Sequence, residues 1–246
     1  MPTPNLKLDH IIIRSGQPEE TLAELAERGR MPIHAPVQSV GGLLSGIVRA
    51  GPIDIEVVAL GDPPAEPVGY GLGFVAPEGF EATVQALRSA GIATSPAPWV
   101  RAGGRRWRAA QIHGLLADPF PAPTSTRELG AVDRIGEVIG GVLVRIPPFS
   151  RAATRKAGSS MVVLTEYGFD VEAERALAAP GPAVAAVRVG TAGFGEAWER
   201  LRLSGVQLHL DDLESGLKEV VLVGRGDDFA IGDVAFTWRT SDQIKS

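Results

Sequence analysis

The first 62 residues alternate between strand-like and helical patterns of apolar positions. Residues 6–14 form a β-branched apolar run, which is typical of a buried strand. Residues 18–28 place apolar side chains on one helical face, with Pro18 suited to the first turn and Gly29 suited to the end. Three further strand-like segments follow at residues 33–37, 43–49 and 53–60. This order predicts a βαβββ unit over residues 1–62.

The pattern restarts after a Pro-rich linker at residues 61–67. A strand at 68–76 precedes a helix at 78–90, and further strand-like segments follow at 97–101, 105–113 and 161–167. Residues 114–160 interrupt the order and are rich in Pro, Gly and Arg, which is typical of a lid, a binding loop or an oligomer contact. The sequence therefore predicts a second βαβββ unit over residues 68–170 with an insertion at about 114–160.

Each predicted helix ends in the same way, with a leucine four residues before a glycine, at Leu25, Leu87 and Leu201. Leu25 and Leu87 lie 62 residues apart, which gives the offset between the first two units. Near Leu201 the chain offers a strand at 184–189, a helix at 194–202, a strand at 205–208, and a final hairpin of 217–223 with 229–238. Repeated units indicate modular duplication. We expect a partial C-terminal βα-hairpin module over residues 181–246.

Two side chains that can bind a metal interrupt apolar strands of the first unit. His10 lies in the run 8–13, and Glu56 lies in the run 53–58. An unpaired His or Glu is a costly choice inside a core strand. Both positions therefore point to one site shared by the first and last strands of this unit.

The overall charge and composition exclude several classes of protein. The formal net charge is -5 and the pI about 5.5, so we expect neither nucleic acid nor an anionic membrane as a partner. The chain has no cysteine, which excludes disulfides, thiolate metal sites and a Cys nucleophile, and fits a cytoplasmic location. We also expect no signal peptide and no membrane span, because no apolar stretch approaches the roughly 20 residues that a spanning helix needs.

Arginines cluster around Trp107, at Arg101, Arg105, Arg106 and Arg108. Strand alternation puts Arg106 and Arg108 on one face and Trp107 on the other. One hypothesis is that Arg106 or Arg108 binds a substrate carboxylate, because a guanidinium binds a carboxylate through two hydrogen bonds. The alternative is a solvated strand, or an ion pair with Glu166. The glycine-rich run 69–74 does not have the dinucleotide-binding spacing, and its glycines would make room near a pocket.

Three short motifs, Leu8-Asp9-His10, Ile55-Glu56 and Arg106-Trp107-Arg108, resemble those of glyoxalase-like proteins of the vicinal oxygen chelate superfamily. This superfamily includes glyoxalases, extradiol dioxygenases and bleomycin-resistance proteins. The resemblance covers residues 6–170 and, more loosely, 181–240. It implies an α+β fold in which tandem βαβββ modules form a cup-shaped mixed sheet.

The resemblance also implies a divalent metal ion in the cup, with ligands from the first and last strands of each module. By position, His10, Glu56 and Glu166 fill three of these four places. The 62-residue offset brings the fourth place to Leu72, which is no ligand, and His113 is an imidazole that could come from elsewhere. The metal could be Zn, Ni, Mn, Fe or Co. If His10 and the carboxylates bind no metal, they are instead hydrogen-bonded or paired with arginines.

Two functions follow as hypotheses. The first is a metal-dependent enzyme with isomerase, lyase or dioxygenase chemistry on a small oxygenated, anionic metabolite, in which Glu56 or Glu166 could act as a base and Arg106, Arg108 and Trp107 could bind the substrate. The second is a metal-free protein that binds or sequesters small molecules, as Leu72 in a ligand position suggests. A homodimer is also expected, since the incomplete third unit could pair through a sheet edge.

Overall fold

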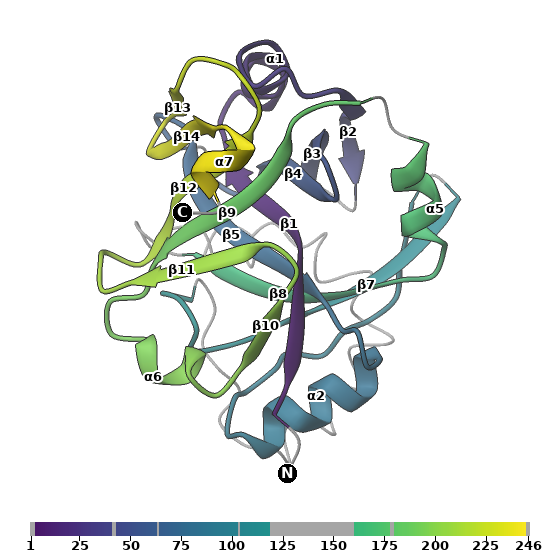
Figure 1. Cartoon of the computed structure of the whole chain (residues 1–246). Helices are drawn as coiled ribbons and strands as arrows, with labels where there is room; N and C mark the ends of the chain where they lie inside the picture. Colours follow the sequence, from purple (N-terminus) through teal and green to yellow (C-terminus); the bar gives the residue numbers. More distant parts are fainter. Residues whose placement is uncertain are drawn as a thin grey trace.

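The computed structural model describes residues 3–40, 43–62, 64–102, 104–118, 160–177 and 180–244. Most of the insertion predicted at 114–160 lies outside these ranges. Two sheets form the framework, a large one built from the N-terminal two thirds of the chain and a small one built from the C-terminal third (Figure 1).

The first unit has the predicted βαβββ order. It consists of β1 (Asn5–Arg14), α1 (Pro18–Arg28), β2 (Ile33–Val40), β3 (Leu43–Ala50) and β4 (Ile53–Ala59). In α1, Pro18 stands in the first turn, and Leu22 and Leu25 are buried. The helix therefore forms for the reasons that the sequence suggests, a favourable start and an apolar stripe facing the sheet.

The second unit repeats this order. It consists of β5 (Val68–Val75), α2 (Phe80–Ser89), β6 (Val100–Ala102), β7 (Arg105–Gln111) and β8 (Met161–Tyr167). A short helix that the hydrophobic pattern does not predict, α5 (Val171–Ala176), follows β8. Asp170 caps α5, since its carboxylate accepts a hydrogen bond from the Ala173 amide at 2.9 Å.

The two units join edge to edge in one mixed sheet. The strand order is β2-β3-β4-β1-β5-β8-β7-β6, with β1 parallel to β4 and β5 parallel to β8. The antiparallel pair β1 and β5 lies at the centre, so the two halves are related as by a twofold axis. The predicted fold class, α+β with tandem βαβββ modules in one mixed sheet, is confirmed.

The C-terminal third contributes β9 (Ala183–Gly190), α6 (Gly195–Trp198), β10 (Arg202–Ser204), β11 (Gln207–Asp211), β12 (Gly216–Val223), β13 (Phe229–Ile231), β14 (Val234–Arg239) and α7 (Ser241–Ile244). The small sheet has the order β11-β9-β12-β14-β13, while β10 joins the large sheet beside β1. Its succession of parallel and antiparallel pairs repeats that of β4-β1-β5-β8-β7. The small sheet therefore repeats the central part of the large one.

Two sequence-based expectations for this region are wrong. Strands β12 and β14 were expected to form one hairpin, but they pair in parallel, and the hairpin is β13–β14. Gly232, with φ of 57°, makes the tight turn between β13 and β14, while residues 224–228 carry the chain back to the start of β13. The helix expected over 194–202 is only the short α6, because β10 takes the residues that follow.

One face of the large sheet builds the main hydrophobic core. Leu6, Leu8, Ile11 and Ile13 of β1 are buried there against residues of α1, α2 and the small sheet. Figure 1 shows the small sheet between α1 and α2 on this side. No helix within the described ranges is long and apolar enough to cross a membrane. The other face of the large sheet is left for a cavity.

Trp198 anchors the C-terminal third to the second unit, and we predict that Trp198→Phe lowers the free energy of unfolding by about 2 kcal/mol. Its side chain is 2% exposed, and Nε1 donates a hydrogen bond to the Leu115 carbonyl at 2.7 Å. Phe cannot donate this bond and leaves a buried carbonyl without its partner. Urea unfolding measures the loss. Trp99→Phe is the control, because Trp99 is 43% exposed; equal losses in the two variants would contradict the anchoring role.

Candidate active site

A β-bulge at Asp9 turns His10 away from the core. Leu8 pairs with Phe74 and His10 pairs with Gly73, so β1 has one residue more than β5 between these pairs. The bulge reverses the alternation of β1: Leu8 faces the core before it, and Ile11 faces the core after it. Without the extra residue, His10 would lie on the core face. The bulge therefore gives the imidazole to the cavity.

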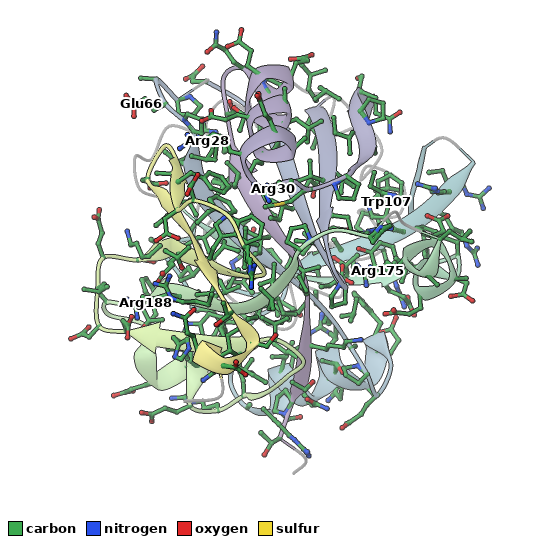
Figure 2. All side chains as sticks on the ribbon, turned by 45° about the horizontal axis from the view of Figure 1, so that its top comes forward. Arg28, Arg30, Glu66, Trp107, Arg175 and Arg188 are labelled. Atoms are coloured by element: carbon green, nitrogen blue, oxygen red, sulfur yellow. The ribbon has the colours of Figure 1, made fainter. Side chains whose placement is uncertain are left out.

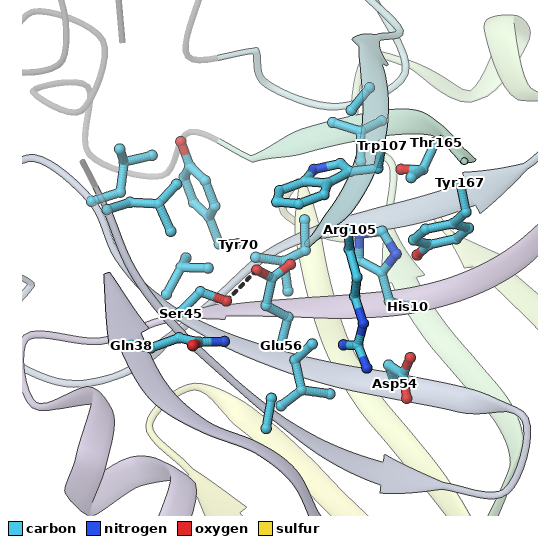
Figure 3. A pocket seen from close by; sticks show the side chains of 18 of the residues that line it. His10, Gln38, Ser45, Asp54, Glu56, Tyr70, Arg105, Trp107, Thr165 and Tyr167 are labelled. Atoms are coloured by element: carbon cyan, nitrogen blue, oxygen red, sulfur yellow. Dashed lines mark hydrogen bonds between the residues drawn. The ribbon is translucent and has the colours of Figure 1, made fainter. Parts of the chain in front are cut away.

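The cavity on this face of the large sheet has a volume of about 520 Å³, a size typical of small-molecule sites. Side chains from both units and from the end of β8 surround it (Figure 3). The lining comprises His10, Ile12, Ala35, Gln38, Ser39, Leu43, Ser45, Ile47, Asp54, Glu56, Val58, Leu60, Tyr70, Arg105, Trp107, Ala109, Met161, Val163, Thr165, Tyr167 and Phe169. Most of these side chains are apolar or aromatic; His10, Asp54, Arg105 and Tyr167 lie towards one end, and Glu56 lies nearer the middle.

Glycines in β5 fit the place of His10. A Cβ at Gly73 would collide with the His10 imidazole, so only glycine at this position leaves room for the ring. A second bulge in β5 separates the pair Ile12–Gly71 from the pair Ile13–Gly69 and brings Tyr70 to the cavity. The glycine-rich run thus makes room near a pocket, as the sequence suggests.

A buried network orients His10. His10 Nδ1 lies 2.9 Å from Asp9 Oδ2, and the Tyr167 hydroxyl donates to the same oxygen at 2.6 Å. The guanidinium of Arg175, from α5, lies 2.7 Å from Asp9 Oδ1. Asp9 occupies Nδ1, and no described residue hydrogen-bonds to Nε2. Nε2 is therefore the ring nitrogen that is available to a ligand.

The network shifts the ionisation of its members. Burial alone would raise the pKa of Asp9, but the hydrogen bond and charge of His10, with Arg175 and Tyr167, lower it to about 2. For His10, burial would lower the pKa, yet the hydrogen bond and charge of Asp9, together with Glu56 and Asp54, raise it. The pair thus favours an ionised Asp9 beside a protonated His10.

Asp54 is committed to two arginines. Arg49 Nε donates to Asp54 Oδ1 at 2.7 Å, and Arg175 Nη2 donates to Asp54 Oδ2 at 3.3 Å. Arg175 therefore bridges Asp9 and Asp54, which connects β1, β4 and α5 beside the cavity. Figure 2 shows Arg175 and Trp107 on the same side of the molecule. No sequence signal pointed to Arg175, since α5 has no apolar stripe.

Glu56 lies in the cavity with a single polar contact among the described residues. The Ser45 hydroxyl donates to Glu56 Oε1 at 2.5 Å (Figure 3). Ser45 is on β3 and pairs with Val58, close to the Glu56–Ile47 pair. The carboxylate thus accepts a hydrogen bond from a hydroxyl, and none of the described arginines pairs with it.

The structure does not bring Glu166 to His10 and Glu56. On β8, Met161, Val163, Thr165 and Tyr167 line the cavity, and alternation turns Glu166 to the opposite face. There Arg108 Nε donates to Glu166 Oε2 at 2.5 Å. Glu166 therefore forms the ion pair with an arginine that the sequence offered as the alternative. The neighbouring residues Thr165 and Tyr167, and not Glu166, face the cavity in which a metal was expected.

Alternation puts Arg106 and Arg108 on one face of β7 and Trp107 on the other, as predicted. The cavity, however, lies on the Trp107 face. Trp107 lines the cavity, whereas Arg108 also pairs with Glu81 at 2.7 Å, and Arg106 lies 4.9 Å from the Trp99 ring. Arg106 and Arg108, which were expected to bind the substrate, therefore do not line this cavity. Arg105 lies on the cavity face instead, a choice that its spacing from Trp107 could have indicated.

The residues present do not complete the metal site that the resemblance implies. His10 and Glu56 are the two side chains of the described lining that could bind a metal and are not paired with an arginine. The β5 residue opposite His10 is Gly73, which has no side chain to bind one. His113, the imidazole that could come from elsewhere, is buried 3.5 Å from Asp118 and is not part of the lining. Within the described ranges, no group of three or more His, Asp or Glu side chains is arranged to hold a metal ion. Catalytic divalent sites commonly use three protein ligands, so this donor set does not fit one.

No protein-family model and no curated protein matches the chain. Among solved structures, it is similar to a hypothetical protein from Staphylococcus aureus, with a TM-score of 0.59 and 9% identity over 96% of this chain and 99% of that one. It is also similar to the Mn(II)-bound glyoxalase from Novosphingobium aromaticivorans, with a TM-score of 0.46 and 7% identity, over 88% and 65% of the two chains. A third similar structure is homoprotocatechuate 2,3-dioxygenase from Arthrobacter globiformis, with a TM-score of 0.40 and 10% identity over 97% of this chain and 62% of that one.

The strand order and the likeness to the Staphylococcus aureus protein define the fold. Tandem βαβββ units meeting at a central antiparallel pair form the vicinal oxygen chelate fold, so the resemblance seen in the sequence is confirmed at the level of the fold. The likeness to the Staphylococcus aureus protein spans nearly all of the chain, so it includes the small C-terminal sheet. Identities this low concern the fold and do not transfer an activity.

We predict that Asp9→Asn reduces the acid sensitivity of folding between about pH 4 and pH 2. The folded-state pKa of Asp9 is lowered from its usual 3.8 to about 2. The ionised carboxylate therefore stabilises the fold above pH 4 by about 2 kcal/mol, and this contribution disappears as the pH falls through 2. Urea unfolding at several pH values measures the slope. Asp227→Asn, at an exposed position, is the control; an unchanged slope in Asp9→Asn would contradict the prediction.

Proposed function

We propose that the protein is an enzyme that moves a proton at the carbon next to a carbonyl group of a small oxygenated molecule, the step on which many isomerases and lyases rely. The observation that supports this most is the pair of uncommitted polar groups in the cavity, His10 Nε2 and the Glu56 carboxylate. They come from neighbouring strands, since Ile12 pairs with Glu56 in the parallel β1–β4 ladder.

His10 would bind the carbonyl oxygen. Asp9 holds Nδ1, which fixes the ring and favours the form that carries a proton on both nitrogens. Nε2 then donates a hydrogen bond to the ligand oxygen, and the bond strengthens as negative charge develops there. In this role Asp9 is a positioning residue and Tyr167 supports it.

Glu56 would act as the base. Its carboxylate takes the proton from carbon, the C–H electrons form the carbon–carbon double bond of an enolate, and the oxygen charge is stabilised by His10. Return of the proton from Glu56 to the same or another carbon completes the exchange or isomerisation. The hydrogen bond from Ser45 fixes the position of the carboxylate.

A ketone that exchanges its protons with solvent tests this step, and we predict that Glu56→Gln lowers the exchange rate about 100-fold or more. The probe is 1-tetralone in D2O, followed by proton NMR at the carbon beside the carbonyl. The amide of Gln keeps the size of Glu56 and accepts no proton.

Glu166→Gln is the matched control for this measurement, because Glu166 lies on the opposite face of the large sheet and should keep the wild-type rate. Equal rates in wild type and Glu56→Gln would contradict the role of Glu56. Binding of the ketone by the wild type without any exchange would contradict catalysis and favour the second candidate function.

That second candidate is a metal-free protein that binds or sequesters a small molecule. It is favoured by the large share of apolar side chains in the lining, which stabilise a ligand without any chemistry. The two candidates predict the same binding and differ only in turnover.

We predict that the purified protein holds well under one equivalent of Mn, Fe, Co, Ni or Zn per chain. Two donors, His10 and Glu56, make a weak site, and no step above depends on an ion. Elemental analysis of protein purified without chelators measures this, with the His10→Ala, Glu56→Ala double variant as the control. Near-stoichiometric metal that the double variant loses would contradict the prediction and restore the metal centre expected from the resemblance.

Three expectations from the sequence stay predictions. They are the cytoplasmic location, the homodimer and the division of the chain into units at residues 1–62, 68–170 and 181–246. Analytical ultracentrifugation tests the homodimer.

A further inference from the structure

A second hydrophobic cluster lies on the cavity face of the large sheet, apart from the main core among the described residues. Its buried members are Ile12, Val58, Tyr70 and Val163, with Leu43, Leu60, Ala109 and Met161 beside them. Every one of these residues lines the cavity. An apolar surface of this kind binds the apolar part of a ligand, because the ligand removes it from water.

Tyr70 places one buried polar atom in this apolar cluster. The residue is 1% exposed, and its hydroxyl oxygen is buried with no hydrogen-bond partner in the described structure. Burial of a hydroxyl without a partner destabilises a protein, so such a group calls for an explanation. One explanation is a ligand that fills the cavity and forms a hydrogen bond with the Tyr70 hydroxyl.

The surroundings of Tyr70 hold its ring in place. The bulge at Gly69–Gly71 turns the ring to the cavity, and the Arg14 guanidinium lies 5.7 Å from the ring centroid. Arg14 is itself fixed, since it donates to the carbonyls of Leu60 and Asp62. The hydroxyl is therefore preorganised. Burial also raises the pKa of Tyr70, although the charge of Arg14 opposes this, so the hydroxyl keeps its proton and can donate it.

The two ends of the cavity differ in charge, although both carry polar groups, since Gln38 and Ser45 lie on the Tyr70 side. Figure 3 shows Tyr70 on one side and His10, Tyr167, Arg105 and Asp54 on the other, with Glu56 between them. A ligand that reaches both ends carries an apolar body between two polar groups.

The charges of the polar end already have partners. Arg105 pairs with Glu174 at 2.9 Å, and Arg49 and Arg175 pair with Asp54. Among the described lining residues, the two cations, Arg105 and protonated His10, each already have a carboxylate partner, and Glu56 would repel an anionic ligand. The expectation of an anionic metabolite therefore has no support in the charges of the site.

We propose that the cavity takes an uncharged, mostly apolar molecule with a carbonyl group at the His10 and Glu56 end and a second hydrogen-bonding group at the far end, which binds the Tyr70 hydroxyl. The carbonyl end rests on the proposed function. Tyr70 is then a specificity-determining residue that selects ligands with an oxygen at the far end.

Calorimetry with matched probes tests this on the full chain. The probes are 6-hydroxy-1-tetralone, which has a far hydroxyl, 1-tetralone, which lacks it, and 6-carboxy-1-tetralone, which is anionic. We expect wild type to bind the hydroxyketone about five- to tenfold more tightly than the ketone, and the carboxylate more weakly than either. Tyr70→Phe should bring the ratio of the two neutral probes to about one, with ketone affinity unchanged.

Tyr167→Phe is the matched control. Tyr167 belongs to the polar end, so its loss should weaken both neutral probes alike and keep their ratio. Tyr70→Phe should also raise the midpoint of thermal unfolding of the free protein by roughly 2–4 °C, because it removes an unsatisfied buried hydroxyl. A purely structural role of the hydroxyl predicts a lower midpoint.

The proposal is overturned if Tyr70→Phe keeps the wild-type ratio, if the carboxylate binds most tightly, or if wild type binds neither neutral probe. The deuterium-exchange measurement tests the catalytic proposal independently of the affinity ratio. Deuterium exchange without a Tyr70-dependent ratio contradicts the ligand class alone, whereas a Tyr70-dependent ratio without exchange contradicts the chemistry alone.

Discussion

The ionised carboxylate of Asp9, buried between His10 and Arg175, is the interaction on which the site depends. A lone buried carboxylate would be strongly unfavourable, so the three neighbours that bind it, His10, Arg175 and Tyr167, stabilise the fold as well as the site. The same contacts fix the His10 ring and connect α5 to β1. Stability and chemistry are thus coupled through one side chain, which the extra residue of a bulge brings inside.

The large sheet separates two tasks by its faces. One face packs against α1, α2 and the small sheet and stabilises the fold, while the other lines a cavity whose charged side chains, apart from Glu56, lie at the end away from Tyr70. Local irregularities adjust this division. The bulges in β1 and β5 turn His10 and Tyr70 to the cavity, and Gly73 makes room for the imidazole. Functional positions therefore coincide with departures from regular alternation.

The fold could be predicted because apolar periodicity and helix-ending glycines repeat along the chain. The closeness of His10 and Glu56 could be predicted because the first and last strands of the first unit, β1 and β4, pair in parallel. The face of a side chain was harder to predict, since one residue of register reverses it. Glu166 and Arg108 were for that reason placed on the wrong face, while Arg105 was passed over. Arg175 and the parallel β12–β14 pair depend on tertiary contacts that no local pattern encodes.

The central claim, that Asp9 fixes His10 through Nδ1 and leaves Nε2 to the ligand, is tested most directly by two-bond proton–nitrogen NMR correlation of the His10 imidazole. Spectra recorded as the pH rises through the titration of His10 report which nitrogen loses its proton. The account predicts that Nδ1 keeps its proton throughout and that Nε2 is the nitrogen that titrates. Loss of the proton from Nδ1, with Nε2 still protonated, would contradict it.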